Sequence, residues 1–196
     1  MAKLLYQGHG SCRFISNKGT VIYADPYAGE GYERPADIVL VTHNHSDHNE
    51  ISLFKPNKGC IIITQKEALV NGRYNNFLVK DIGVLATPAY NDNHNRSECV
   101  GYVITIDNIK VYFSGDTSLI AEMEKLKAMN IDYALLPVDG IYNMGPEEAS
   151  ECVKLIGAKH YIPIHTSPGK LFDRKIAEAF QAEGRIILEA GQEQEL

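Results

Sequence analysis

The segment DIVLVTHNHSDHNE (residues 37–50) joins an apolar run to a cluster of three imidazoles and one carboxylate. The run Ile38 to Val41 is typical of a buried strand, and such a strand holds the loop that follows it at a fixed place on the sheet edge. Side chains of one rigidly held loop can converge on a point. Imidazole nitrogen and carboxylate oxygen together suit zinc, and also manganese, iron or nickel. The segment therefore predicts a metal site built on His43, His45, Asp47 and His48.

The alternative is a polar loop whose histidines face solvent, with Ser46 and Asp47 as turn formers. The chain has seven histidines in 196 residues, so three within six positions are hard to explain by chance. This favours the metal site. We expect the loop to be exposed, so that removing His48 would open no core.

Composition narrows the classes of partner and compartment. The net charge is −6, so the field of the molecule repels phosphate backbones and acidic lipids, and no nucleic acid partner is expected. No apolar stretch of about 20 residues is present to cross a bilayer, and no membrane partner is expected either. The four cysteines form no C-x-x-C pair and the N-terminus carries no signal-like apolar run. We expect a cytoplasmic protein that takes a small-molecule substrate, and both a monomer and a homo-oligomer stay open.

The pattern along the chain predicts an α/β protein with one domain, residues 1–196. Short apolar segments separated by Gly, Asn, Pro and Asp predict a β meander in the first half, and helices alternate with strands in the second half. The predicted strands include KLLYQ, CRFIS, TVIYAD, DIVLVTH, GCIIIT, NFLV, IGVLATP, VGYVITID, IKVYFSG, YALLPVD, KHYIPIH and RIILEA. The predicted helices are Gln65 to Asn71, Leu119 to Met129, Pro146 to Ile156 and Phe172 to Glu183. In the second of these helices, apolar residues recur every three positions from Ile120 to Met129.

THNHSDH resembles the H-x-H-x-D-H motif of the metallo-β-lactamase superfamily. Four further segments, GHGSCRFI, VIYADP, KVYFSGDTS and LLPVDGIYNMGPEEA, are similar to blocks of its lactonase-like branch, the branch of L-ascorbate-6-phosphate lactonase. Together with IPIH, the resemblance extends from Gly8 to about His165. It implies a four-layer αββα sandwich with the metals at one edge, between the two sheets.

The resemblance also implies roles for individual residues. His43 and His45 would bind a first metal, and Asp47 and His48 a second. Asp116 matches the bridging carboxylate of the family, and His165 matches the last histidine of the second site. Each of these two residues also follows an apolar strand, so each can be held at the same sheet edge. On its own, Asp116 could equally be a turn residue or a helix N-cap.

The third histidine of the first site departs from the family pattern. Most members present it in a Pro-Gly-His turn, whereas this chain has TPAYNDNHNRSE, with Tyr90 and Asn91 near the expected position. The nearest imidazole is His94, and we predict that it completes the site. Alternatively, His94 lies on a mobile loop and the first site is weak or empty. The sequence therefore leaves open whether one or two metal ions are bound.

Two further residues are candidates for substrate binding. His9, in GHGS, follows a short strand near the expected edge. We expect it to contact substrate or metal directly, or to orient a metal ligand by a hydrogen bond. Arg96 lies near His94 in the sequence and is a candidate partner for a substrate anion, although an exposed charge is usually only solvated.

The predicted activity is hydrolysis of a small, anionic ester, lactone or phosphodiester. Water between two zinc ions loses a proton near neutral pH and becomes a positioned nucleophile, with Asp47 and Asp116 as ligands that orient it. A non-catalytic metal-binding or sensing module with a degenerate first site is the main alternative. A diiron redox enzyme is a third hypothesis, disfavoured because His45 stands where that group has glutamate.

Overall fold

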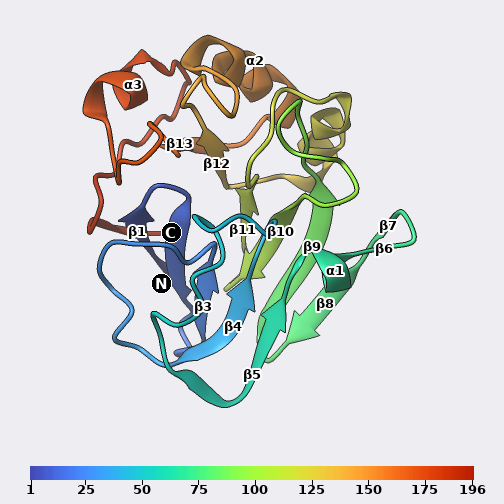
Figure 1. The fold of residues 1–196 in the computed structure, drawn as a ribbon, viewed down its shortest axis with the longest axis vertical. Coiled ribbons are helices and arrows are strands. Elements are labelled where there is room, and N and C mark those ends of the chain that lie inside the picture. The colour runs from blue at the N-terminus through green and yellow to red at the C-terminus, as the bar shows by residue number, and fades with distance from the viewer.

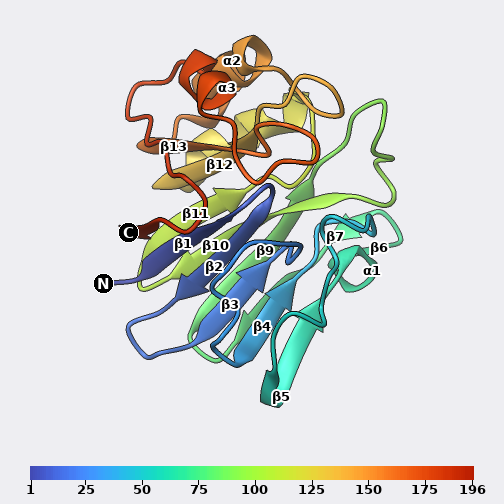
Figure 2. The same cartoon turned by 60° about the vertical axis from the view of Figure 1, so that its left-hand side comes forward.

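The computed structural model describes residues 1–196 as two six-stranded sheets packed face to face (Figures 1 and 2). The N-terminal sheet has the order β14-β1-β2-β3-β4-β5. Its strands are β1 (Lys3–Gly8), β2 (Ser11–Ile15), β3 (Val21–Ala24), β4 (Ala36–Leu40), β5 (Pro56–Ile63) and β14 (Glu193–Glu195). Because β14 pairs with β1, the two ends of the chain lie side by side (Figure 2).

The C-terminal sheet has the order β13-β12-β11-β10-β9-β8. Its strands are β8 (Asn76–Val79), β9 (Ile82–Pro88), β10 (Val100–Ile106), β11 (Ile109–Phe113), β12 (Tyr133–Pro137) and β13 (His160–Ile164). In both sheets the meander strands are antiparallel, and the pairs β3–β4, β4–β5, β11–β12 and β12–β13 are parallel. The carboxyl ends of these parallel strands therefore point to one edge of the sandwich.

The main core lies between the two sheets. Strand β4 shows how alternation builds it: Ile38 and Leu40 point inward to this core, whereas Val39, and Val41 just after the strand, belong to a smaller apolar cluster on the outer face. That outer face is covered by loops rather than by helices, and the ring of Tyr23 stacks on those of Tyr32 and Phe54.

The helical layer covers the outer face of the C-terminal sheet (Figure 1). It consists of η1 (Ala121–Met129), α2 (Pro146–Ile156) and α3 (Arg174–Ala179). The α/β sandwich expected from the sequence is thus present, with loops replacing helices in one of its outer layers. None of the helices combines the length and the apolar character needed to span a bilayer.

Three predicted helices differ from their expected form. The first ends early as α1 (Gln65–Ala68), because Asn71 and Gly72 both adopt positive φ and form the two-residue turn of the hairpin β6 (Leu69–Val70) and β7 (Arg73–Tyr74). The second, η1, is a 3₁₀ helix, which suits apolar residues spaced by three. The fourth, α3, is shorter than predicted and begins at the N-cap Asp173.

The predicted strand RIILEA is not formed. Only Arg185 makes an isolated bridge, with Tyr161 of β13. Beyond it the chain crosses from one sheet toward the other, burying Leu188 in the main core before β14 pairs with β1. The apolar run therefore serves a buried crossing instead of an edge strand.

Phe14 tests the main core, because its side chain is fully buried between the sheets. We expect Phe14→Ala to lower the free energy of unfolding by about 3–5 kcal/mol, measured by urea denaturation, because it leaves a cavity. The matched control is Leu78→Ala on exposed β8, for which we expect a change within about 0.5 kcal/mol. Similar losses in both variants would contradict the assigned core.

Candidate metal centre

Six of the seven histidines meet at the edge of the sandwich to which the parallel strands point. They come from separate loops, each of which follows a strand: His9 after β1, the loop 42–48 after β4, His94 after β9 and His165 after β13. Asp116 follows β11 in the same way. The convergence of these chain segments gives the edge a density of nitrogen and oxygen ligands that no structural duty requires.

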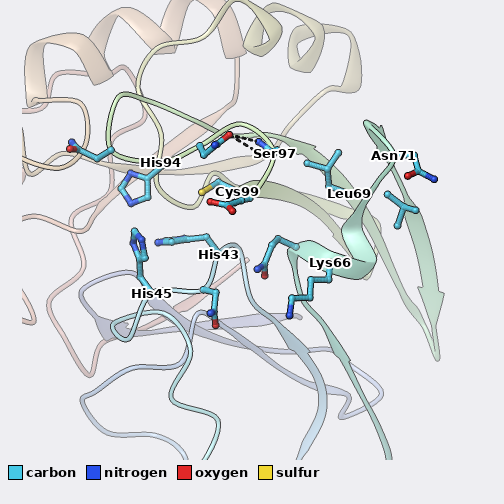
Figure 3. A pocket seen from close by; sticks show the side chains of 14 residues that line it. His43, His45, Lys66, Leu69, Asn71, His94, Ser97 and Cys99 are labelled. Atoms are coloured by element: carbon cyan, nitrogen blue, oxygen red, sulfur yellow. Dashed lines mark hydrogen bonds between the residues drawn. The ribbon is translucent and has the colours of Figure 1, made fainter.

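A first group consists of His43, His45 and His94, one potential ligand atom of each lying within 4.8 Å of the others. The ring centroid of His94 is 4.9 Å from that of His43 and 5.0 Å from that of His45. In Figure 3, His94 faces the other two rings from the opposite wall of a cavity. His94 is buried, although it lies on an irregular loop.

A second group consists of His9, Asp47, His48 and His165, again with one ligand atom of each within 4.8 Å of the others. His9 Nε2 lies 3.1 Å from Asp47 Oδ2. This hydrogen bond is the main cause that holds the pKa of Asp47 well below its usual range. The ring centroids of His9 and His165 are 3.8 Å apart.

The buried carboxylate of Asp116 lies between the two groups. Its Oδ1 is 3.5 Å from His48 Nε2, and its Oδ2 is 3.3 Å from His94 Nε2 and 3.5 Å from His165 Nε2. Asn143 Nδ2 donates to the same Oδ2 at 3.0 Å, which fixes the orientation of the carboxylate. One residue thus contacts both groups.

The histidine nitrogens that face away from Asp116 have partners of their own. Asp25 Oδ2 lies 2.9 Å from Nδ1 of His48, and Asn91 Oδ1 lies 2.9 Å from Nδ1 of His94. Partners of this kind fix the tautomer and the ring orientation of a metal ligand.

The rings of His43 and His165 also have one partner each. Thr42 Oγ1 lies 2.9 Å from Nδ1 of His43, and Asp139 Oδ2 makes an ion-pair contact of 2.9 Å with Nδ1 of His165. In contrast, the inward Nε2 atoms of His43 and His48 are buried and make no hydrogen bond. A buried polar atom without a partner is costly, and a metal ion would satisfy both. The donor set therefore fits metal binding.

The electrostatics of the centre favour a cation. Burial lowers the pKa of His43 to about 2, so this ring stays neutral and offers a lone pair. Burial also disfavours a charge on His48, but the carboxylates of Asp116 and Asp25 outweigh it and raise the pKa of His48 to about 9. A bound metal ion would supply the positive charge that these carboxylates otherwise draw onto His48.

Three of the eight non-glycine residues with positive φ lie at the same place. His9, Asp25 and His165 have φ values of 54°, 45° and 45°, in the left-handed region that non-glycine residues rarely occupy. Such conformations cost on the order of 1–3 kcal/mol each and persist where the surroundings enforce them, which is frequent at functional sites.

A cavity of about 670 Å³ opens beside the first group (Figure 3). Polar residues dominate its walls. They include the carboxamides of Asn44, Gln65, Asn71, Asn93 and Asn95, together with Lys66 and Glu98. A smaller cavity of about 290 Å³ lies over both groups and is lined by His45, Asp47, Asn93, His94, Asp116, Tyr142 and His165.

The predicted residues thus lie together, with two qualifications. The loop is not uniformly exposed: His45 is exposed, but His43 and His48 are buried, so our expectation that His48 faces solvent was wrong. Arg96 lies apart from the histidines, since its guanidinium pairs with Glu122 at 2.5 Å. Its role in substrate binding stays a prediction. His9 contacts Asp47, in keeping with the orienting alternative.

The residues behind the rings were not predicted from the sequence. Asp25, in VIYADP, and Asp139, in LLPVDG, each follow an apolar strand, as the metal-ligand candidates do. That shared position is a pattern that could have identified both. Asn91 offers no comparable pattern, because it lies in an irregular loop.

Comparison with known proteins shows the family to which the chain belongs. Residues 3–165 match the beta-lactamase superfamily domain. A UPF0173 metal-dependent hydrolase of Methanospirillum hungatei is 31% identical, with 99% of each chain covered. Igni18, a metallo hydrolase from Ignicoccus hospitalis, is 25% identical with a TM-score of 0.74, covering 100% of this chain and 99% of that one. CmlA, a diiron β-hydroxylase from Streptomyces venezuelae, shares the fold alone, at 14% identity and TM-score 0.73 over 54% of its own length.

Fold and site together define a metal-dependent hydrolase of the metallo-β-lactamase superfamily, and the expected fold class is confirmed. Within that superfamily, the chain belongs to the UPF0173 metal-dependent hydrolases.

Asp25 tests the support behind the rings. We expect Asp25→Asn to weaken zinc binding by about 10–100-fold, measured by competition with a chelating dye, because His48 and Thr42 lose a charged partner. Asn also tolerates positive φ, so the fold should persist. The control is Asp107→Asn, likewise at positive φ but in a distant hairpin turn. Equal affinity in both variants would refute the supporting role.

Proposed function

We propose that the centre holds two zinc ions, with manganese, iron or nickel as substitutes. The first ion is bound by one group and the second by the other, with Asp116 shared between them. The proposed ligands are His43, His45 and His94 for the first ion, and Asp47, His48 and His165 for the second. The observation that carries the proposal is the position of the Asp116 carboxylate, within 3.5 Å of histidine nitrogens from both groups.

We propose hydrolysis of an ester, lactone or phosphodiester bond as the reaction. When bound, the two ions supply an acidified water and stabilise the charge that develops on oxygen. The chain supplies the geometry: Asp47 and Asp116 orient the nucleophile, His9 fixes the carboxylate of Asp47, and Asn143 fixes that of Asp116. His9 would then affect the substrate only through Asp47, without contacting it.

The cavity beside the first group supports a small, polar substrate. Five carboxamides offer both donors and acceptors. The charge of Lys66 is balanced by that of Glu98, so the walls themselves do not favour a substrate of either charge. The positive charge would come from the metal ions, which favours an anionic group or a polarised carbonyl next to the histidines. Choice among ester, lactone and phosphodiester rests on the resemblance to the lactonase-like branch, and fold does not fix substrate.

The two alternatives fit the site less well. A non-catalytic sensor with a degenerate first site is disfavoured because His94 is buried and its Nδ1 is held by Asn91. A diiron redox enzyme would share the fold, as CmlA does, but the donor set here is rich in imidazole and includes His45. Both observations support the hydrolase.

His45 is the best residue for testing the first site, since it is exposed and its loss opens no core. We expect His45→Ala to lower hydrolysis of p-nitrophenyl acetate or bis(p-nitrophenyl) phosphate by about 100-fold or more, because even the partners behind metal ligands carry 10–100-fold effects. His160→Ala removes the one histidine outside the centre and should leave turnover unchanged. Full activity of His45→Ala would count against the mechanism.

Metal dependence provides an independent test. We expect dialysis against a chelator to abolish hydrolysis and added zinc or manganese to restore it, because both ions accept nitrogen and oxygen ligands. Metal content measured by mass spectrometry should rise toward two ions per chain as activity returns. Activity that survives complete removal of metal would contradict the proposal, and binding of metal without any turnover would favour the sensor.

A further inference from the structure

The loop after β12 brings one phenol to the cavity over both groups. Tyr142 lines this cavity together with the proposed ligands from each group and with Asn93. Its side chain is 53% exposed, and its hydroxyl makes no hydrogen bond within the protein. Buried tyrosines elsewhere in the chain, such as Tyr6 and Tyr102, donate hydrogen bonds from their hydroxyls to backbone carbonyls. The hydroxyl of Tyr142 is therefore free to bind a ligand in the cavity.

The backbone of Tyr142 is held on both sides. Its N–H donates to Asp139 Oδ1 at 2.7 Å, and its carbonyl accepts from Asn91 Nδ2 and Asn93 Nδ2, each at 3.0 Å. Asp139 also contacts His165, and Asn91 also contacts His94. The two residues that position one ring of each group thus also hold the backbone of Tyr142, whose side chain lines the cavity over the centre.

We infer that Tyr142 is a catalytic residue that donates a proton to the leaving oxygen of the substrate; this inference rests on the proposed hydrolysis. Water attacks the carbonyl or phosphoryl centre, and the bond to the leaving oxygen breaks with its electron pair on that oxygen. The Tyr142 hydroxyl supplies the proton that forms the product alcohol. The attacking water releases one proton to solvent as the new bond forms, and the phenolate takes one proton back from solvent, so that one water is consumed overall and the phenol is restored.

Other side chains around the cavity are less suited to this step. His94 and His165 contact Asp116, Asp47 is paired with His9, and His45 is a proposed ligand of the first ion. The amide of Asn93 can donate a hydrogen bond but cannot yield a proton. Arg96 pairs with Glu122 away from the cavity. Of the cavity residues, only Tyr142 combines an unpaired hydroxyl with a fixed backbone.

The test compares Tyr142→Phe with wild type on two esters of the same acid that differ in leaving group. With zinc-loaded protein, we expect kcat/KM for phenyl acetate to fall about 100-fold. For p-nitrophenyl acetate we expect a fall of about threefold or less, because p-nitrophenolate departs without a proton. Equal losses on both esters, or no loss on either, would overturn the inference.

A binding measurement separates this inference from the proposed function. We expect inorganic phosphate to bind zinc-loaded Tyr142→Phe about tenfold more weakly than wild type by calorimetry, since one hydrogen bond is lost. If wild type hydrolyses neither ester nor any diester, the proposed activity fails, and the phosphate titration still decides on Tyr142. An unchanged phosphate affinity then overturns its role.

Two controls exclude a merely structural effect. Tyr142→Phe removes only an exposed hydroxyl, so its thermal unfolding and zinc content should equal those of wild type. Ile141→Ala alters the neighbouring exposed residue, which does not line the cavity, and should leave both the leaving-group dependence and the phosphate affinity unchanged. If Ile141→Ala reproduced the effect of Tyr142→Phe, loop geometry would explain the loss, and the proton-donor role would be rejected.

Discussion

A buried carboxylate surrounded by imidazoles is the constraint on which the centre depends. Asp116 is almost inaccessible to water, and an isolated charge in such a place would be strongly destabilising. The rings of His48, His94 and His165 approach it from three different loops. Because no lysine or arginine reaches the carboxylate, its compensation falls to protonated histidine or to a metal ion. The site at this edge of the sandwich is therefore suited to binding a cation.

That constraint explains why the surrounding chain is strained and heavily hydrogen-bonded. Rings must aim one nitrogen at the centre, so the other nitrogen needs a partner, and Asp25 and Asp139 supply two of these. Both carboxylates follow parallel strands, as Asp116 does, so the same topology that delivers the ligands delivers their supports. The positive φ of Asp25 and His165 is the local cost of directing these side chains inward.

The sequence predicted what depends on strand position and failed where tertiary register matters. His43 to His48 were found from a motif that follows an apolar strand. Asp116 and His165 were assigned by the family resemblance, which their positions after apolar strands support. The Asn71-Gly72 turn, by contrast, ends a helix that periodicity alone would extend, and RIILEA is apolar because it crosses the core, not because it pairs. The spacing of apolar residues in the sequence specifies neither the early end of this helix nor the path of this segment. Contacts such as Asn91 to His94 depend on how an irregular loop folds back, which no local pattern specifies.

The same loops connect the histidine rings of the centre with the wall of the cavity above them. Asp139 and Asn91 each hold a ring from one group and also hold the backbone of Tyr142, so a change in either would move a ring and the cavity wall together. Proteins that share this fold can perform different chemistry, as the diiron hydroxylase CmlA illustrates, because strands fix where ligands stand while loops decide what stands above them. In this chain the loop after β12 contributes both a support for His165 and a free phenol. A substitution in this loop therefore alters the cavity above the centre without disturbing the sheets.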